Sequence, residues 1–193
     1  MSAAGRDVER QHLDCYNTPA WAAETICSWL YGQGYLFDRH VLEPSVGAGA
    51  FVRASAAYGL ASMTVNDINP DSSGLLLVPE EARLVGNFCD AAWPGKDRSF
   101  GLVLGNPPYR EAQKHVETAL TMSPIVAFLL RLGFLAGQKS SGFWQKSPPA
   151  HIRVFSRCPS FTSGGTDATD YALMVWDRRT GVPAAGSPRL GWI

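Results

Sequence analysis

Several features are scarce or missing in this sequence, and each absence narrows the class of protein. Basic and acidic residues number 17 each, so the net charge is zero; this argues against a strongly basic surface but leaves room for a local one. No run approaches the roughly 18 apolar residues of a membrane span, and no apolar signal segment begins the chain. The four cysteines show no CxxC spacing. We expect a cytoplasmic protein without membrane contact, disulfide framework or metal site.

The 193 residues are enough for one domain with a full core. Residues 1–15 are small and polar, which predicts a flexible N-terminus. Residues 179–193 are rich in Pro, Gly and Ala, which predicts an irregular tail. We therefore expect one folded domain over residues 16–178 and no separate domain after it.

Short apolar runs alternate with segments of helical periodicity. The runs predict seven strands, at residues 39–44, 62–68, 82–86, 100–105, 125–130, 151–155 and 171–177. Helical spacing predicts helices at residues 22–30, 52–58, 111–120 and 132–138. This alternation is typical of an α/β protein with a mostly parallel sheet.

The segment Asn106-Pro107-Pro108-Tyr109 follows the buried run at residues 100–105 directly. Because proline supplies no N–H to a sheet, the strand must stop there. Asn106 then lies at the carboxyl end of a strand, where open α/β sheets bind their ligands. An amide, a rigid turn with carbonyl groups and an aromatic ring suit a flat molecule with an amino group at its edge.

A second turn, containing Gly47 and Gly49, follows the strand that ends with Glu43. A strand, a Gly-x-Gly turn and a helix bring backbone close to a nucleoside. The third glycine of the dinucleotide fingerprint is missing, and Glu43 suits a cation better than a phosphate. Asp67 lies 24 residues after Glu43, a spacing that suits ribose hydroxyls, although an Asx turn before Asn69 remains the alternative.

Other segments allow two interpretations each. Thr18 and Pro19 predict a capped helix start, or a loop near a ligand. The predicted loop at residues 140–149 carries Phe143 and Trp144 near lysines, which indicates a nucleic-acid contact or a packed surface loop. Phe161 lies in a polar loop and is a candidate for stacking on a ligand or for simple loop packing.

Taken together, Glu43-Pro44-Ser45-x-Gly47-x-Gly49-x-Phe51 and Asn106-Pro107-Pro108-Tyr109 resemble motifs of the S-adenosylmethionine-dependent adenine-N6 DNA methyltransferases, especially small phage- and prophage-type members. The resemblance extends to Asn17-Thr18-Pro19 and to residues 157–161 and 171–176. It implies a Rossmann-like class I methyltransferase fold, a three-layer sandwich around a mostly parallel seven-stranded sheet. It also implies S-adenosyl-L-methionine as cofactor and methyl transfer to adenine N6 in DNA after base flipping.

The resemblance also implies residue roles. Asn106, Pro107, Pro108 and Tyr109 would form the catalytic segment, with Tyr109 and Phe161 stacking on the flipped base. The cofactor would contact Asn17, Thr18, Pro19, Glu43, Pro44, Ser45, Gly47, Gly49, Asp67, Ile68 and Asn106. The family usually has an acid before the phenylalanine that follows its third strand, whereas here Asn87 precedes Phe88 and an acid returns only at Asp90. Asn87 and Asp90 are both candidates for the adenine contact, beside Phe88.

Only 16 residues follow Asp177, so we expect no separate target-recognition domain. Without such a domain, the protein would bind duplex DNA weakly, act on single strands or RNA, or rely on a partner protein that recognises the target sequence. Two further hypotheses stay open: the same chemistry on RNA adenine or on a protein glutamine amide, and a non-catalytic nucleotide-binding partner subunit.

Overall fold

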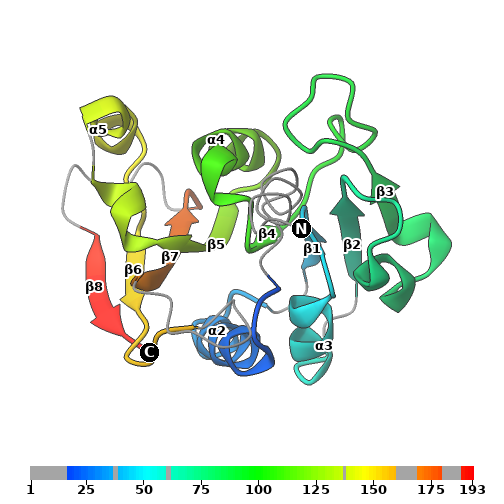
Figure 1. The fold of residues 1–193 in the computed structure, drawn as a ribbon, viewed down its shortest axis with the longest axis horizontal. Helices are drawn as coiled ribbons and strands as arrows, with labels where there is room; N and C mark the ends of the chain where they lie inside the picture. The colour runs from blue at the N-terminus through cyan, green and yellow to red at the C-terminus, as the bar shows by residue number, and fades with distance from the viewer. Residues whose placement is uncertain (1–16, 37–38, 60–61, 137, 160–168, 180–187) are drawn as a thin grey trace, which may run out of the picture.

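The computed structural model describes residues 17–36, 39–59, 62–136, 138–159, 169–179 and 188–193. These residues contain one eight-stranded sheet in the order β3-β2-β1-β4-β5-β7-β6-β8 (Figure 1). The strands are β1 (His40–Glu43), β2 (Ser62–Asp67), β3 (Arg83–Val85), β4 (Leu102–Gly105), β5 (Ile125–Arg131), β6 (His151–Val154), β7 (Tyr171–Asp177) and β8 (Arg189–Trp192). All seven predicted strands are present, each within two residues of its predicted ends.

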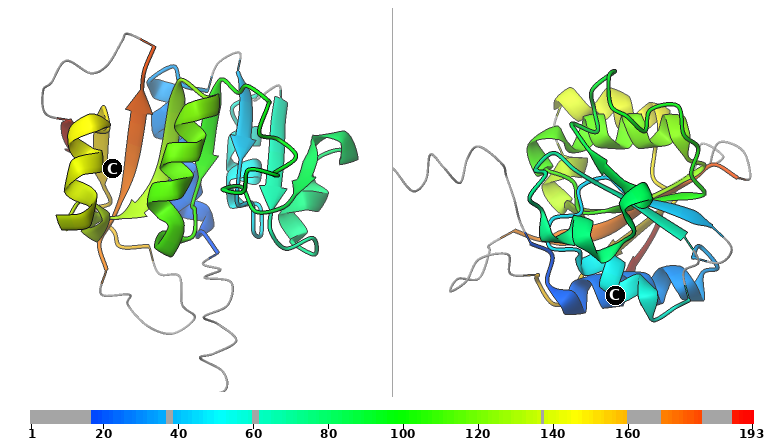
Figure 2. Two further views of the ribbon diagram at one scale, coloured as in Figure 1. Left: turned by 90° about the horizontal axis from the view of Figure 1, so that it is seen from above. Right: turned by 90° about the vertical axis from the view of Figure 1, so that its right-hand side faces the viewer.

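Helices cover both faces of this sheet. The α-helices are α2 (Ala20–Gly32), α3 (Ala50–Ala56), α4 (Ala112–Met122) and α5 (Gln138–Lys146). Short 3-10 helices are η1 (Ser73–Leu77), η2 (Glu80–Ala82), η3 (Tyr109–Glu111) and η4 (Leu132–Leu135). Helices α2 and α3 lie on one face and α4 and α5 on the other, and both views of Figure 2 show the sheet between them. This arrangement is the expected three-layer sandwich.

The directions of the strands place most of their carboxyl ends at one edge of the sheet. Strands β1 to β5 are mutually parallel, β7 is antiparallel to its neighbours β5 and β6, and β8 is parallel to β6. The carboxyl ends of every strand except β7 therefore meet at the same edge, together with the start of β7. The strand order changes direction between β1 and β4, and such switch points are where open α/β sheets bind ligands.

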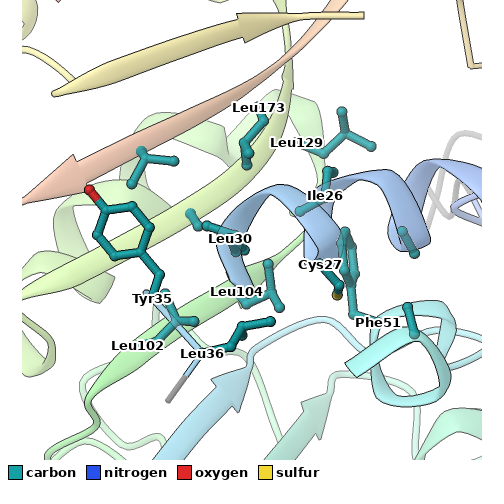
Figure 3. Packing of buried hydrophobic residues seen from close by; sticks show 14 of the residues in the cluster. Ile26, Cys27, Leu30, Tyr35, Leu36, Phe51, Leu102, Leu104, Leu129 and Leu173 are labelled. Atoms are coloured by element: carbon teal, nitrogen blue, oxygen red, sulfur yellow. The ribbon is translucent and has the colours of Figure 1, made fainter. Parts of the chain in front are cut away.

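The core consists of two apolar layers, one on each face of the sheet. In β5, Ile125, Ala127 and Leu129 pack toward α2, while Val126, Phe128 and Leu130 pack toward α4. Figure 3 shows Ile26, Cys27 and Leu30 of α2 packed against the first layer. Because both faces of the central strands are covered, their sequences are apolar throughout rather than alternating, which explains why residues 125–130 form an unbroken apolar run.

Two segments differ from the sequence-based expectation. The predicted loop at residues 140–149 is wrong, because α5 extends to Lys146. Trp144 of this helix donates its indole N–H to the Phe134 carbonyl at 3.1 Å, and its ring stacks on Trp176 at 6.1 Å. The aromatic rings that drew attention to this segment thus pack against the protein. The predicted helix at residues 132–138 is only the short η4.

The predicted irregular tail is also wrong in part, because residues 189–192 form β8 and make the sheet eight-stranded rather than seven-stranded. Pro, Gly and Ala indicated irregular structure, but β8 gains its order from pairing with β6, which a local pattern cannot reveal. The helices of the described residues include none with the length and apolar character needed to cross a bilayer.

Candidate functional site

A cleft lies where β1, β2, β3 and β4 end, and its empty space is about 760 Å³ including the open mouth. Its walls come from five stretches of chain: the residues before α2, the turn after β1, the end of β2, the turn after β3 and the segment after β4. The lining residues are Asn17, Thr18, Glu43, Pro44, Ser45, Val46, Gly47, Ala48, Ala50, Asn66, Asp67, Ile68, Gly86, Asn87, Phe88, Asn106, Pro108, Glu111 and His115.

The glycine turn after β1 depends on two left-handed residues. Gly47 has φ of 49° and Gly49 has φ of 80°, values that side-chain-bearing residues rarely adopt. A Cβ at Gly49 would also overlap the Leu77 side chain. The Gly74 N–H of η1 donates to the Gly47 carbonyl at 2.9 Å, so η1 supports the turn from behind. Gly47 lines the cleft, whereas Gly49 acts only through the shape of the turn.

Glu43 ends β1 beneath this turn with only 2% of its surface exposed. Burial, and secondarily the nearby Asp67 carboxylate, raise the pKa of Glu43 well above its usual range. Among the described residues, the buried Oε2 of Glu43 has no hydrogen-bond partner. A buried carboxyl group that lines a cleft in this state suits a ligand that brings positive charge or an N–H donor.

Asp67 ends β2 and accepts two backbone hydrogen bonds. Its Oδ2 accepts from the Gly47 N–H at 2.8 Å, and its Oδ1 accepts from the Asn69 N–H at 2.9 Å. The second bond is the Asx turn that formed the alternative in the sequence analysis. Asp67 also lines the cleft, so the turn and a ligand contact are compatible, since each carboxylate oxygen carries two lone pairs.

Asn66, which sequence reasoning missed, holds three chain segments together. Its amide nitrogen donates to the carbonyls of Pro44 at 2.9 Å and Gly86 at 3.1 Å. Its amide oxygen accepts the indole N–H of Trp93 at 2.7 Å. Asn66 is 1% exposed, and its bonds to Pro44 and Trp93 are buried, whereas its bond to Gly86 is partly buried beside the cleft. An amide near the end of a buried strand was the signal that such a network existed.

Asn106 lies at the end of β4 and donates its amide N–H to the Thr18 hydroxyl at 3.1 Å. This bond orients the Asn106 amide and joins segments 88 residues apart. The expectation that Thr18 caps α2 is wrong: the helix cap is Pro19, with no side-chain bond. Instead, the Thr18 hydroxyl accepts a hydrogen bond across the cleft.

Tyr109 lines a second, adjacent cleft rather than the first. Its neighbours there are Arg110, Ala112, Leu130, Arg131, Gly133, Phe134 and Thr169. The Arg131 guanidinium lies 4.6 Å from the centre of the Tyr109 ring, and the Tyr171 ring centre lies 5.7 Å away. Pro108 lines the first cleft, so the segment after β4 separates the two clefts and contributes to both.

The two candidates for an adenine contact, Asn87 and Asp90, both lie in the turn after β3, but only Asn87 lines the cleft. Asn87 lines the first cleft and its side-chain oxygen accepts the Cys89 N–H at 3.0 Å. Asp90 is exposed, accepts the Ala92 N–H at 2.8 Å and is not among the cleft-lining residues. Phe88 lines the cleft with 2% exposure, packed edge-on against Trp93.

His115 of α4 also lines the cleft, beside Phe88. It is buried, and burial lowers its pKa, so the ring is neutral near pH 7. Its Nδ1 lies 3.1 Å from the Glu111 carbonyl and 3.3 Å from Cys89 Sγ. Because a carbonyl only accepts, Nδ1 carries the proton.

Cys89, Glu111 and His115 bring ligand types of a metal site within 4.8 Å of one another. Burial raises the pKa of the Cys89 thiol to about 11, so sulfur keeps its proton in the free protein. The contacts of His115 Nδ1 with the Glu111 carbonyl and with Cys89 Sγ join these residues by hydrogen bonds at the end of the cleft.

The structure thus brings most of the predicted site residues together. Those that line the first cleft are Asn17, Thr18, Glu43, Pro44, Ser45, Gly47, Asp67, Ile68, Asn87, Phe88, Asn106 and Pro108. Those outside its lining are Pro19, Gly49, Asp90, Pro107 and Tyr109. Phe161 lies outside the described residues.

No protein-family model and no curated protein matches the sequence. Solved structures do match the fold. A candidate RNA methyltransferase, PH1948 from Pyrococcus horikoshii, has a TM-score of 0.66 and 14% identity, covering 83% of this chain and 85% of that chain. A candidate class I S-adenosylmethionine-dependent methyltransferase from Listeria monocytogenes has a TM-score of 0.62 and 11% identity, covering 93% of this chain and 66% of that chain.

The M protein of the type I restriction enzyme EcoKI is similar as well, with a TM-score of 0.67 and 13% identity. It covers 84% of this chain, which spans only 44% of that subunit. At such identities these similarities show the fold alone. The chain has the α/β fold of the class I methyltransferases, as expected.

The Asn66 network should be essential for stability. We expect Asn66→Ala to lower the free energy of unfolding by about 2–4 kcal/mol, because the buried Pro44 carbonyl, the half-buried Gly86 carbonyl and the buried Trp93 indole N–H lose their partner. Urea denaturation measures this change. Asn69→Ala, which removes one exposed bond to the Asp71 N–H, should cost less than about 1 kcal/mol. Equal losses in the two variants would contradict the role of Asn66.

Glu43 should make stability depend on pH. Its pKa is raised in the folded state, so its contribution is complete below the unfolded-state value near 4.5 and is lost as pH rises through the folded value. Glu43→Gln removes this titration. In thermal unfolding of the free protein from acidic to mildly alkaline pH, the wild type should lose stability relative to Glu43→Gln. A difference that stays constant over this range would show that Glu43 titrates normally.

Proposed function

We propose that this protein is an S-adenosyl-L-methionine-dependent methyltransferase that methylates the N6 amino group of adenine in DNA. The observation that carries the proposal is the shared cleft of Glu43 and Asn106. Glu43 offers a buried carboxyl group suited to positive charge, and Asn106 offers a fixed amide suited to a flat amine. Methyl transfer from a cationic donor to a planar amine needs these two partners side by side.

The residues of the cleft fit the parts of this cofactor, which supplies an electrophilic methyl group on a positively charged sulfur. Glu43 would face its cationic portion, and binding would favour the ionised carboxylate. The Gly47 turn would let backbone approach closely, and Asp67 would accept the ribose hydroxyls while keeping its turn. Ile68, which is 55% exposed although apolar, would cover the adenine. We assign the adenine edge to Asn87 rather than Asp90, because Asn87 lines the cleft.

Asn106 and Pro107 would act on the acceptor amine. The exocyclic nitrogen of adenine is a weak nucleophile because its lone pair is conjugated into the ring. The Asn106 side-chain oxygen and the Pro107 carbonyl would accept its two N–H groups, which concentrates charge on nitrogen and fixes its direction. Thr18 holds the Asn106 amide in one orientation in advance, so reorganisation is small. Positioning and preoriented dipoles would supply most of the acceleration.

A second candidate keeps this chemistry and changes the acceptor to adenine in RNA, which the similarity to a candidate RNA methyltransferase favours. A glutamine amide of a protein has the same planar geometry and is a third acceptor to test. The M protein of EcoKI belongs to a type I restriction enzyme. We propose by analogy that a partner protein supplies sequence recognition, since the described residues form a single sheet with its covering helices.

Asn106→Ala separates binding from chemistry. We expect cofactor affinity, measured by calorimetric titration, to change by less than about threefold, and methyl transfer to fall by about 10²–10³-fold, because an oriented acceptor is lost. Thr18→Val should cause a smaller loss, since it removes only the group that orients Asn106. Full activity of Asn106→Ala would contradict the mechanism.

The acceptor itself can be identified by labelled-methyl transfer to DNA, RNA and protein, followed by mass spectrometry of nucleosides and peptides. N6-methyladenine from DNA is the expected product. Methylated glutamine would overturn the proposed acceptor. A wild-type protein that fails to bind the cofactor would instead favour a non-catalytic partner subunit.

A further inference from the structure

A row of arginine and aromatic side chains continues from Asn106 along the carboxyl-end edge of the sheet. Arg131 ends β5 and pairs in register with Tyr171 at the start of β7. The Phe155 N–H, just after β6, donates to the Tyr171 carbonyl at 3.1 Å. These residues therefore follow one another across neighbouring strands, and at about 4.8 Å per strand the row extends roughly 15 Å from the end of β4.

Two planar cations stack on aromatic rings in this row. Arg131 lies 4.6 Å from the ring centre of Tyr109. Arg157, which is exposed, lies 4.9 Å from the ring centre of Trp21 in the first turn of α2. Trp21 in turn packs edge-on against Phe155 at 5.7 Å. Each guanidinium thus lies over an aromatic ring, and arginine paired with an aromatic ring is a combination on which other flat groups stack.

Arginines gather at this edge although the whole chain carries no net charge. Arg110 is exposed and shares the second cleft with Arg131, and Arg157 lies farther along. The acidic residues at this edge are Glu111, which follows Arg110, and Asp170, which precedes Tyr171. We call Tyr109, Arg110, Arg131, Tyr171, Phe155, Arg157 and Trp21 the arginine row.

We propose that the arginine row binds single-stranded nucleic acid, with the reacting base at Asn106 and the flanking nucleotides along the row. The proposal rests on the proposed function and names the form of its substrate. Unpaired bases can stack on rings and guanidinium groups, and arginines beside them can hold phosphates. A duplex hides the faces of its bases, so its binding depends on many contacts between phosphates and cationic side chains. A chain without net charge, with three arginines at this edge, offers few such side chains.

Binding of fluorescently labelled oligonucleotides to the full chain tests this without methyl transfer. We expect a single strand of about 12 nucleotides, as DNA or RNA, to bind at least about tenfold more tightly than the matching duplex. Arg157→Gln should weaken single-strand binding about fivefold or more. If Arg157 holds one phosphate, the slope of log affinity against log salt concentration should also become shallower by about 0.7. Comparison of the DNA and RNA strands identifies which polymer is preferred.

Two control variants sharpen the result. Arg189→Gln removes one exposed charge at the start of β8, on the opposite edge of the same sheet, and should leave binding unchanged. Arg157→Lys keeps the charge without the planar group, so it should retain the salt dependence while losing affinity.

The proposal fails if the duplex binds as tightly as the single strand, or if Arg157→Gln and Arg189→Gln behave alike. Methylation of adenine in duplex DNA alone would refute single-strand binding while leaving the proposed function intact. If no oligonucleotide binds and glutamine is methylated, both proposals fail.

Discussion

The hydrogen bonds of one buried amide, Asn66, determine where three chain segments leave the sheet. An amide inside a sheet must find partners for its nitrogen and oxygen, because an unpaired polar group there is costly. Asn66 meets this requirement with the carbonyls of Pro44 and Gly86 and with the Trp93 indole. The chain exits after β1 and β3 are thereby held against the end of β2. The glycine turn and the Asn87 turn both line the cleft.

The hydrogen-bonded strand ends surround Glu43, a buried carboxyl group whose charged form is unfavourable at this position. Glu43 is buried beside Asp67, and its carboxylate form is disfavoured in the free protein. Such a residue lowers stability above its unfolded-state pKa, and the well-packed layers on either side of β1 and β4 offset that loss. A local conflict between charge and burial, retained within an otherwise consistent structure, is typical of functional sites. A positively charged ligand would remove the conflict.

The sequence predicted the parts of this fold whose signal is local. Seven apolar runs indicated seven strands, and the polar residues that end four of them, Glu43, Asp67, Asn87 and Asn106, all line one cleft. The errors have a common cause, which is partners distant in sequence. Strand β8 is ordered by β6, the aromatic residues of α5 by Trp176, and the Thr18 hydroxyl by Asn106 rather than by its own helix. The position of Asn66 in an apolar strand indicated that its amide has hydrogen-bond partners, but only the structure identifies Pro44, Gly86 and Trp93 as those partners.

The pairing of β1 with β4 also bears on the order of folding. Val41 and Leu102 are paired although 61 residues separate them, whereas the partners within β1–β2 or β4–β5 are far closer in sequence. Because distant contacts close larger loops, we expect the two halves of the sheet to assemble before they join. Glu43 belongs to one half and Asn106 to the other, so the cleft comes into existence only when the halves meet. Any ligand that spans the cleft therefore binds only the fully assembled sheet, and its binding shifts the folding equilibrium toward that state.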